Sequence, residues 1–190
     1  MYVSRTSKAE AHEDGIWSIA WSQNGQIITG SCDETVRTFT LPSQDLQQKH
    51  ELKGHQLGVV SVSVGKEGRI AASSALDSHI RIWDLERGVE ERAIDVGPVE
   101  AWTVSMHPAS KIVASGSQGG NINMWSTDTG QKLQTLATNG KFVMSVAFSP
   151  DGRIAACGAA DGAITLFDVE TNVRMLALFR LWSGVVSREV

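Results

Sequence analysis

Cysteine is scarce in this 190-residue chain. It has only Cys32 and Cys157, which lie far apart and form no C-x-x-C motif. The sequence therefore suggests neither a disulfide framework nor a zinc site, and a reducing compartment is the default expectation. No Lys- and Arg-rich run is present and the net charge is −4, which argues against a broad phosphate-binding surface. We expect no direct contact with nucleic acid.

Long apolar runs are also absent. The longest late run, "MLALF", is followed at once by Arg180, and no segment approaches the length that spans a bilayer. The N-terminal stretch "MYVSRTSKAEAHEDG" lacks the apolar centre of a signal peptide. No sustained 3.6-residue period occurs, so few helices are expected. These absences predict a cytoplasmic and nuclear protein that does not engage a membrane.

What the chain does contain is a fourfold repeat. The segment "CDETVRTFTL" at 32–41 recurs as "LDSHIRIWDL" at 76–85, "GGNINMWST" at 119–127 and "ADGAITLFDV" at 160–169. The aromatic residues near the ends of these segments are spaced by 44, 42 and 42 residues: Phe39, Trp83, Trp125 and Phe167. Each unit also has other short runs rich in Val, Ile and small residues, bounded by turn residues, which are strand signals.

A period of about 40–45 residues with four strands per unit is typical of a β-propeller blade. Blades must stack on one another to bury their faces. We therefore expect an all-β propeller of about four blades, each with four antiparallel strands, at 11–53, 54–95, 96–137 and 138–175. This repeat type closes best with about seven blades, so we expect an incomplete ring. A divergent tail follows at 176–190.

The second unit contains Ser, His and Asp residues that could form a hydrolase triad. Ser73, however, lies inside a strand run rather than on a sharp turn, and no Gly-rich oxyanion turn adjoins it. A structural network accounts for these residues and for Trp83 as well. In it Asp77 accepts from His55 and from turn amides, while Ser73 joins His55 to the Trp83 indole. We interpret the four as a brace and keep the hydrolase as the competing class.

Partial copies of this set occur in the other units. Such repetition is expected of residues that brace a turn, but not of a catalytic site. The first unit has His12, Thr29, Asp33 and Phe39; the third has Gly97, Ser115, Gly119 and Trp125; the fourth has Asn139, Cys157, Asp161 and Phe167.

One repeat position, five residues after the histidine position, carries large apolar side chains. It is expected on the innermost strand near one rim, where such side chains could anchor a partner or pack between blades. The candidate partner contacts are Trp17, Val60, Trp102 and Met144. No cofactor or metal site is expected, because the remaining histidines lack ligand spacing.

The pair Gly54-His55, the turn residue Asp77 and the terminal pair Trp83-Asp84 resemble the WD-repeat propeller family, and the resemblance extends over residues 11–175. Longer strings are similar to the WD-repeat subunits of the superkiller complex: "GHQLGVVSVSV", "AASSALDSHIRIWDLERG", "DVGPVEAWTVSM" and "GKFVMSVAFSPDGRIAACGAADG".

The resemblance implies a non-catalytic scaffold for protein partners. These would be the helicase and tetratricopeptide subunits of the superkiller complex in 3′-to-5′ mRNA decay, and subunits of the RNA polymerase II-associated factor complex in transcription elongation. After "FDVE" the family would continue into a fifth blade, whereas this sequence reads "TNVRMLALFRLWSGVVSREV". The chain therefore resembles a C-terminally truncated member. The alternative within the class is another WD-repeat adaptor, such as a ubiquitin-ligase substrate receptor.

Overall fold

The computed structural model describes residues 7–42, 45–98, 100–138 and 140–175. These residues form sixteen strands, and no helix occurs among them. Nothing in the described ranges is therefore a helix long and apolar enough to cross a membrane. The predicted all-β fold is confirmed.

The strands form four sheets of four, which we call blades one to four in chain order. Blade one contains β1 (Ile16–Trp21), β2 (Ile27–Ser31), β3 (Val36–Thr40) and β4 (Gln47–Leu52). Blade two contains β5 (Val59–Val64), β6 (Ile70–Ala75), β7 (His79–Asp84) and β8 (Val89–Asp95). Blade three contains β9 (Thr103–Met106), β10 (Ile112–Gly116), β11 (Asn121–Ser126) and β12 (Lys132–Ala137). Blade four contains β13 (Val143–Phe148), β14 (Ile154–Ala159), β15 (Ile164–Asp168) and β16 (Arg174–Met175).

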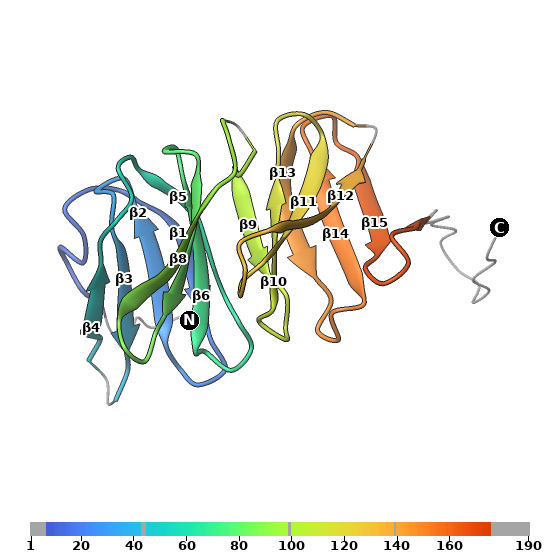
Figure 1. The fold of residues 1–190 in the computed structure, drawn as a ribbon. Coiled ribbons are helices and arrows are strands. Elements are labelled where there is room, and N and C mark those ends of the chain that lie inside the picture. Colours follow the sequence, from blue (N-terminus) through green and yellow to red (C-terminus); the bar gives the residue numbers. More distant parts are fainter. Residues whose placement is uncertain (1–6, 43–44, 99, 139, 176–190) are drawn as a thin grey trace, which may run out of the picture.

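Each blade is a simple antiparallel meander in which sequence neighbours pair, as in β1-β2-β3-β4. The blades follow one another along the molecule, with blade one and blade four at opposite ends (Figure 1). The first strands of successive blades lie next to each other, β1 against β5, β5 against β9, and β9 against β13. This stacking is what places the same repeat position of every blade on a common rim.

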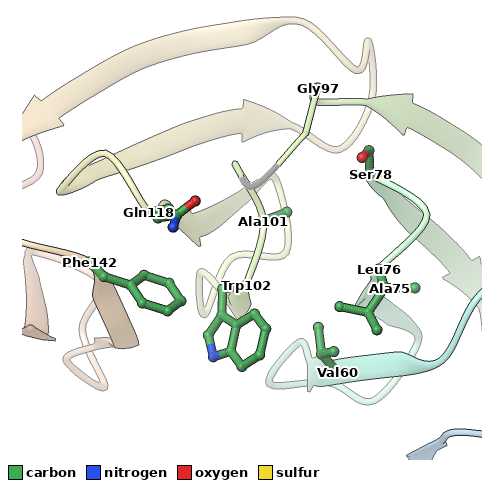
Figure 2. A pocket seen from close by; sticks show the side chains of 9 residues that line it. All are labelled: Val60, Ala75, Leu76, Ser78, Gly97, Ala101, Trp102, Gln118 and Phe142. Carbon is green, nitrogen blue, oxygen red and sulfur yellow. The ribbon is translucent and has the colours of Figure 1, made fainter. Parts of the chain in front are cut away.

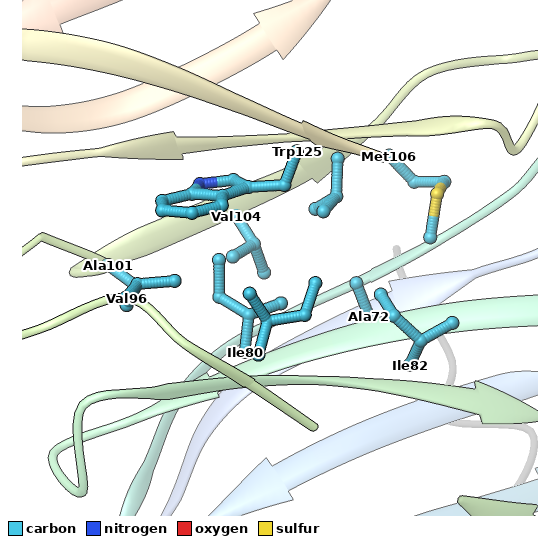
Figure 3. Packing of buried hydrophobic residues seen from close by; sticks show 10 residues of the cluster. Ala72, Ile80, Ile82, Val96, Ala101, Val104, Met106 and Trp125 are labelled. Carbon is cyan, nitrogen blue, oxygen red and sulfur yellow. The ribbon is translucent and has the colours of Figure 1, made fainter. Parts of the chain in front are cut away.

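The core consists of three apolar clusters, each shared by two consecutive blades. Figure 3 shows the middle one, in which Ile80 and Ile82 of blade two meet Val104 and Trp125 of blade three. Burying an Ile or Val side chain contributes about 1.5–3 kcal/mol. Because each cluster needs residues from both neighbours, a single blade cannot bury its own faces, as the repeat pattern predicted.

Close packing between blades depends on small residues in the second strand. A Cβ atom added at Gly30 would lie 2.6 Å from a methyl of Val59 and 2.8 Å from a methyl of Val62. At the same repeat position in blade three, a Cβ at Gly116 would lie 2.7 Å from a Val143 methyl. The missing side chain lets the next blade's first strand approach the sheet.

The repeat pattern in the sequence predicts the fourth strand of blade four at "VRMLALF", residues 173–179. The structure describes only its beginning, Arg174–Met175, which pairs with Leu166 and Phe167. The remainder, and the predicted tail at 176–190, lie outside the described residues. The repeat boundaries that we assigned from the sequence stay predictions.

Candidate functional site

Blade two brings its four predicted polar residues together. His55 precedes β5, Ser73 lies in β6, Asp77 lies in the β6–β7 turn and Trp83 lies in β7. The Nδ1 atom of His55 is 2.9 Å from Asp77 Oδ2, and its Nε2 atom is 2.7 Å from Ser73 Oγ. The Trp83 indole donates to Ser73 Oγ over 2.8 Å. The four groups thus form one continuous chain of hydrogen bonds.

The protonation states along this chain of hydrogen bonds follow from which groups can donate. A carboxylate only accepts, so His55 Nδ1 carries the proton toward Asp77, and the Ser73 hydroxyl donates to His55 Nε2. Burial lowers the pKa of His55, and this outweighs the opposite effect of Asp77, so the ring is neutral. Burial acts to raise the pKa of Asp77, but bonds from the Gln56 amide and from His55 outweigh it and the pKa is lowered. Asp77 is therefore a firmly ionised acceptor.

Asp77 also shapes the turn that contains it. Its carboxylate accepts from the amides of Gln56, at 3.0 Å, and His79, at 3.1 Å. Ser78, the residue between Asp77 and β7, has a left-handed φ of 66°. The carboxylate thus ties the segment before β5 to a strained turn between the middle strands.

The arrangement does not suit a hydrolase. Ser73 is fully buried, and its oxygen already accepts from the Trp83 indole. A serine nucleophile has to reach its substrate, which this side chain cannot do in the structure described. The geometry therefore favours the brace over the catalytic interpretation.

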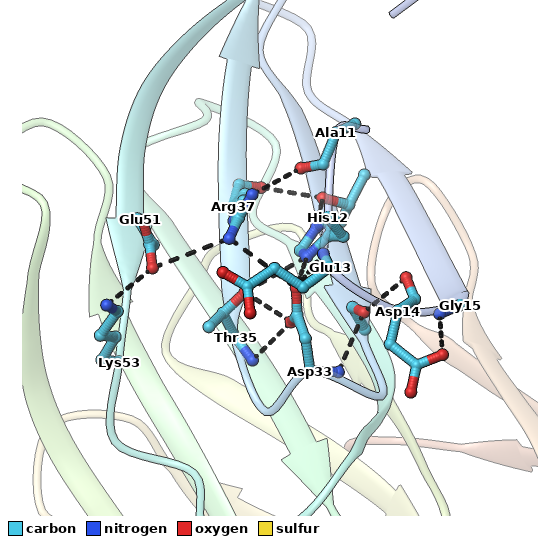
Figure 4. Close-up of polar contacts among 12 residues, drawn as sticks. Ala11, His12, Glu13, Asp14, Gly15, Asp33, Thr35, Arg37, Glu51 and Lys53 are labelled. Atoms are coloured by element: carbon cyan, nitrogen blue, oxygen red, sulfur yellow. Dashed lines mark hydrogen bonds and ion pairs between the residues drawn. The ribbon is translucent and has the colours of Figure 1, made fainter. Parts of the chain in front are cut away.

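Blade one repeats the brace with a charged extension (Figure 4). His12 is 2.8 Å from Asp33 and 2.6 Å from Thr29. Burial acts to raise the pKa of Asp33, but hydrogen bonds from Thr35, the Glu13 amide and His12 hold it far below its ordinary range. Arg37 adds a bond to the Ala11 carbonyl at 2.9 Å, which anchors the segment entering the blade. The sequence analysis did not single out Arg37, although the second repeat also has an arginine, Arg81, at this position.

Blades three and four keep only parts of the brace. In blade three the Trp125 indole donates to Ser115 at 3.0 Å, and Ser115 donates to the Glu100 carbonyl at 3.0 Å. No histidine is involved, because Gly97 occupies that position. In blade four Asp161 is exposed and accepts from the Ala163 amide at 3.0 Å, while Cys157 is buried. Asn139 lies outside the described residues.

Two of the predicted partner contacts line an apolar cavity of about 200 Å³ (Figure 2). Val60 projects from β5, and Trp102 stands just before β9 with 41% of its surface exposed. The Trp102 ring meets Phe142 edge to face, with centroids 5.4 Å apart and planes at 74°. Leu76, from the turn after β6, closes the opposite side. The cavity thus presents an aromatic wall and an aliphatic wall.

Trp17 and Met144 occupy the same repeat position but are not among the residues that line this cavity. Both are exposed, on β1 and β13 respectively. Phe142 and Leu76 were missed from the sequence. Phe142 could have been noticed, because no other repeat has a large apolar residue at its position, where Gly15, Gly58 and Glu100 stand. Among the described residues, no cluster of three or more His, Cys, Asp or Glu side chains could hold a metal ion.

The stacked four-stranded blades, with a brace inside and an apolar rim outside, define a β-propeller of the interaction-scaffold class. The family described as "WD domain, G-beta repeat" matches residues 4–39, 46–84, 96–126 and 130–168. The chain therefore belongs to the WD40 repeat family, whose members are in general non-catalytic and mediate contacts between proteins.

Curated relatives match parts of the chain. The WD repeat-containing protein SL1-17 of Schistosoma mansoni is 37% identical over 113 residues, which are 57% of this chain and 38% of that protein. The WD repeat-containing protein VIP3 of Arabidopsis thaliana is 33% identical over 103 residues, 52% of this chain and 32% of VIP3. Superkiller complex protein 8 of Dictyostelium discoideum is 34% identical over 90 residues, 47% of this chain and 30% of that protein. The matched segment thus spans about a third of each relative.

Proposed function

We propose that this chain is a non-catalytic scaffold that binds an extended segment of a protein partner at the cavity beside Trp102. The observation that supports this is the cavity itself, an apolar hollow on the rim, lined by an exposed tryptophan in edge-to-face contact with Phe142. Exposed aromatic side chains at the edge of a pocket are the residue type that dominates interface energetics.

The two walls of the cavity define what it would take. Trp102 and Phe142 offer ring faces and edges, and Val60 and Leu76 offer methyl groups. Gln118 and Ser78 are the polar side chains that line it, and the Gln118 amide can pair with a main-chain amide of a bound segment. An extended peptide that inserts one aliphatic or aromatic side chain between the walls fits this chemistry.

The finer proposal is that the partners belong to the superkiller complex in 3′-to-5′ mRNA decay and to the RNA polymerase II-associated factor complex in transcription elongation. The quoted sequence strings and the similarity to superkiller complex protein 8 support it. Such roles would place the protein in the cytoplasm and the nucleus. Another WD-repeat adaptor, such as a ubiquitin-ligase substrate receptor, is the alternative.

The test is binding of the purified chain to recombinant helicase and tetratricopeptide subunits, and in parallel to elongation-complex subunits, by calorimetry. Binding that is lost in Trp102→Ala but kept in Leu133→Ala supports both the assembly and the site; Leu133 is an exposed apolar residue on β12, outside the cavity. Binding to neither assembly overturns the finer proposal. Equal binding by the two variants overturns the site.

A further inference from the structure

The turn between β1 and β2 contains an asparagine followed by a glycine, Asn24-Gly25. The backbone nitrogen that follows an asparagine can attack the carbonyl carbon of the asparagine side chain. Glycine favours this attack because it has no Cβ to crowd the nitrogen. Asn24 is exposed, so solvent reaches the side chain that would react.

The exposure of Asn24 is a property of its place in the turn. In each blade the turn between the first two strands is closed by a bond from the amide that follows this position. The counterparts of Asn24 are Glu67, Ala109 and Asp151, and all three are exposed. Each of them belongs to a blade that packs on another blade before it. The access to Asn24 therefore does not depend on what lies beside β1.

Two donors polarise the side-chain carbonyl of Asn24. The Ser22 hydroxyl donates to Oδ1, and the Gln26 amide donates to the same oxygen over 3.3 Å. Donors at a carbonyl oxygen stabilise the negative charge that develops there during nucleophilic attack. The bond to Gln26 also closes a ring that contains the Gly25 nitrogen, which is the attacking atom. That nitrogen donates to the Ser22 carbonyl at 3.1 Å, a bond that local opening of the turn releases.

The same side chain forms a contact between blades one and two. Asn24 Nδ2 donates to the Gly68 carbonyl over 3.4 Å. A Cβ atom added at Gly68 would lie 2.4 Å from Asn24 Oδ1, so the asparagine lies directly against the equivalent turn of blade two. A carboxylate in place of the amide has no proton to donate and would face the Gly68 carbonyl oxygen. Loss of the amide would therefore remove this contact.

We propose that Asn24 is a site of spontaneous deamidation, through which the chain weakens its own contact between blades one and two. The Gly25 nitrogen forms a bond to the Asn24 side-chain carbonyl carbon, and the bond from that carbon to Nδ2 breaks. The proton of the Gly25 amide and the amide group of Asn24 leave together as ammonia, and a cyclic succinimide remains. Water then opens the succinimide at either carbonyl, which gives aspartate or isoaspartate. The proposal is independent of the cavity beside Trp102.

The turn accommodates the two products differently. Blade four already has an aspartate at this position, Asp151, which accepts from the hydroxyl two residues before it and the amide two residues after it, at 2.6 and 3.1 Å. An aspartate at position 24 keeps the corresponding pair of bonds but loses the contact with Gly68. Isoaspartate adds a carbon to the main chain, so it also disturbs the turn that the Gly25 amide closes.

The first test follows the full 190-residue chain during incubation in mildly alkaline buffer. Mass spectrometry of the tryptic peptide 9–37, in which Asn24 is the only asparagine, measures conversion to the acid. Labelling with an isoaspartate methyltransferase detects the second product. The internal control is peptide 154–174, whose only asparagine, Asn172, is exposed but precedes a valine. We expect conversion at Asn24 to be faster than at Asn172, to yield both products and to accelerate as the pH rises. Asn24→Gln should abolish it.

The second test is the effect on stability. Asn24→Asp reproduces one product, and we expect it to lower the denaturant midpoint of the chain. Gln23→Glu adds the same charge at the neighbouring exposed position of the turn and should leave the midpoint unchanged. Conversion at Asn24 that is no faster than at Asn172 would overturn the modification site. A midpoint unchanged by Asn24→Asp, or lowered equally by both variants, would overturn the loss of the contact between blades.

Discussion

The indole nitrogen of Trp83 lies 2.8 Å from the hydroxyl oxygen of Ser73, in the centre of blade two. Trp125 and Ser115 make the same bond over 3.0 Å in blade three. In blade two the Ser73 hydroxyl donates a hydrogen bond to His55, and His55 donates one to Asp77. A tryptophan in the third strand is thus linked to a turn on the rim, and each donor that is buried along the way has a partner.

Removing the turn carboxylate should destabilise blade two. Asp77→Ala leaves His55 and the amides of Gln56 and His79 without their acceptor, and we expect a loss of about 1–3 kcal/mol in the free energy of unfolding. Denaturant titration measures it. Asp161→Ala is the matched control, because Asp161 holds the same turn position but is exposed, and among the described residues its hydrogen bond comes from the Ala163 amide. Equal losses in the two variants would show that the brace adds nothing.

Stability should fall as the solution is acidified through the histidine range. The pKa of His55 is lowered in the folded chain, while an unfolded histidine titrates near about 6.5. Between these values the unfolded state binds more protons, so the contribution of His55 is complete above the unfolded value and declines below it. The slope from this one group is at most about 1.4 kcal/mol per pH unit.

The measurement is the denaturant midpoint between about pH 7.5 and pH 5.5, which brackets this titration. His55→Asn, which copies the residue at this position of the fourth repeat, should show a shallower decline than the parent chain. The lowered pKa of Asp77 adds a second loss of stability below about pH 4. Parallel slopes for parent and variant would mean that His55 does not titrate with unfolding.

The rim cavity should depend on its tryptophan. Trp102→Ala is expected to weaken binding of the partner by more than about 1 kcal/mol, because it removes one aromatic wall of the cavity. The melting temperature should change little, since Trp102 is exposed. Calorimetry against the bound partner gives the affinity, and Leu133→Ala provides the control. An unchanged affinity would exclude the cavity as the contact.

Two glycines at one repeat position should respond differently to a methyl group. Gly116→Ala forces a Cβ to 2.7 Å from Val143 and should cost about 1–3 kcal/mol of stability. Gly158→Ala meets open space and should be neutral or slightly stabilising. Both variants are compared with the parent chain by denaturant titration. A large loss at Gly158 would contradict the open face of blade four.

The sequence alone was sufficient for the four-bladed all-β architecture, because strand pairing within each blade is local and every blade repeats the same alternation and turns. It also supplied His55, Ser73, Asp77 and Trp83 as neighbours, since the Trp83 indole and the His55 ring each needed a partner at a fixed offset within one sheet. Trp102 and Trp17 share a repeat position, and only the tertiary structure showed that Trp102 lines the cavity whereas Trp17 does not. The difference depends on Phe142 and Leu76, which come from adjacent blades and meet Trp102 only after stacking. It likewise decided that Ile122 is buried while Ile164 is exposed, because burial depends on whether another blade lies beside the strand and not on the residue itself.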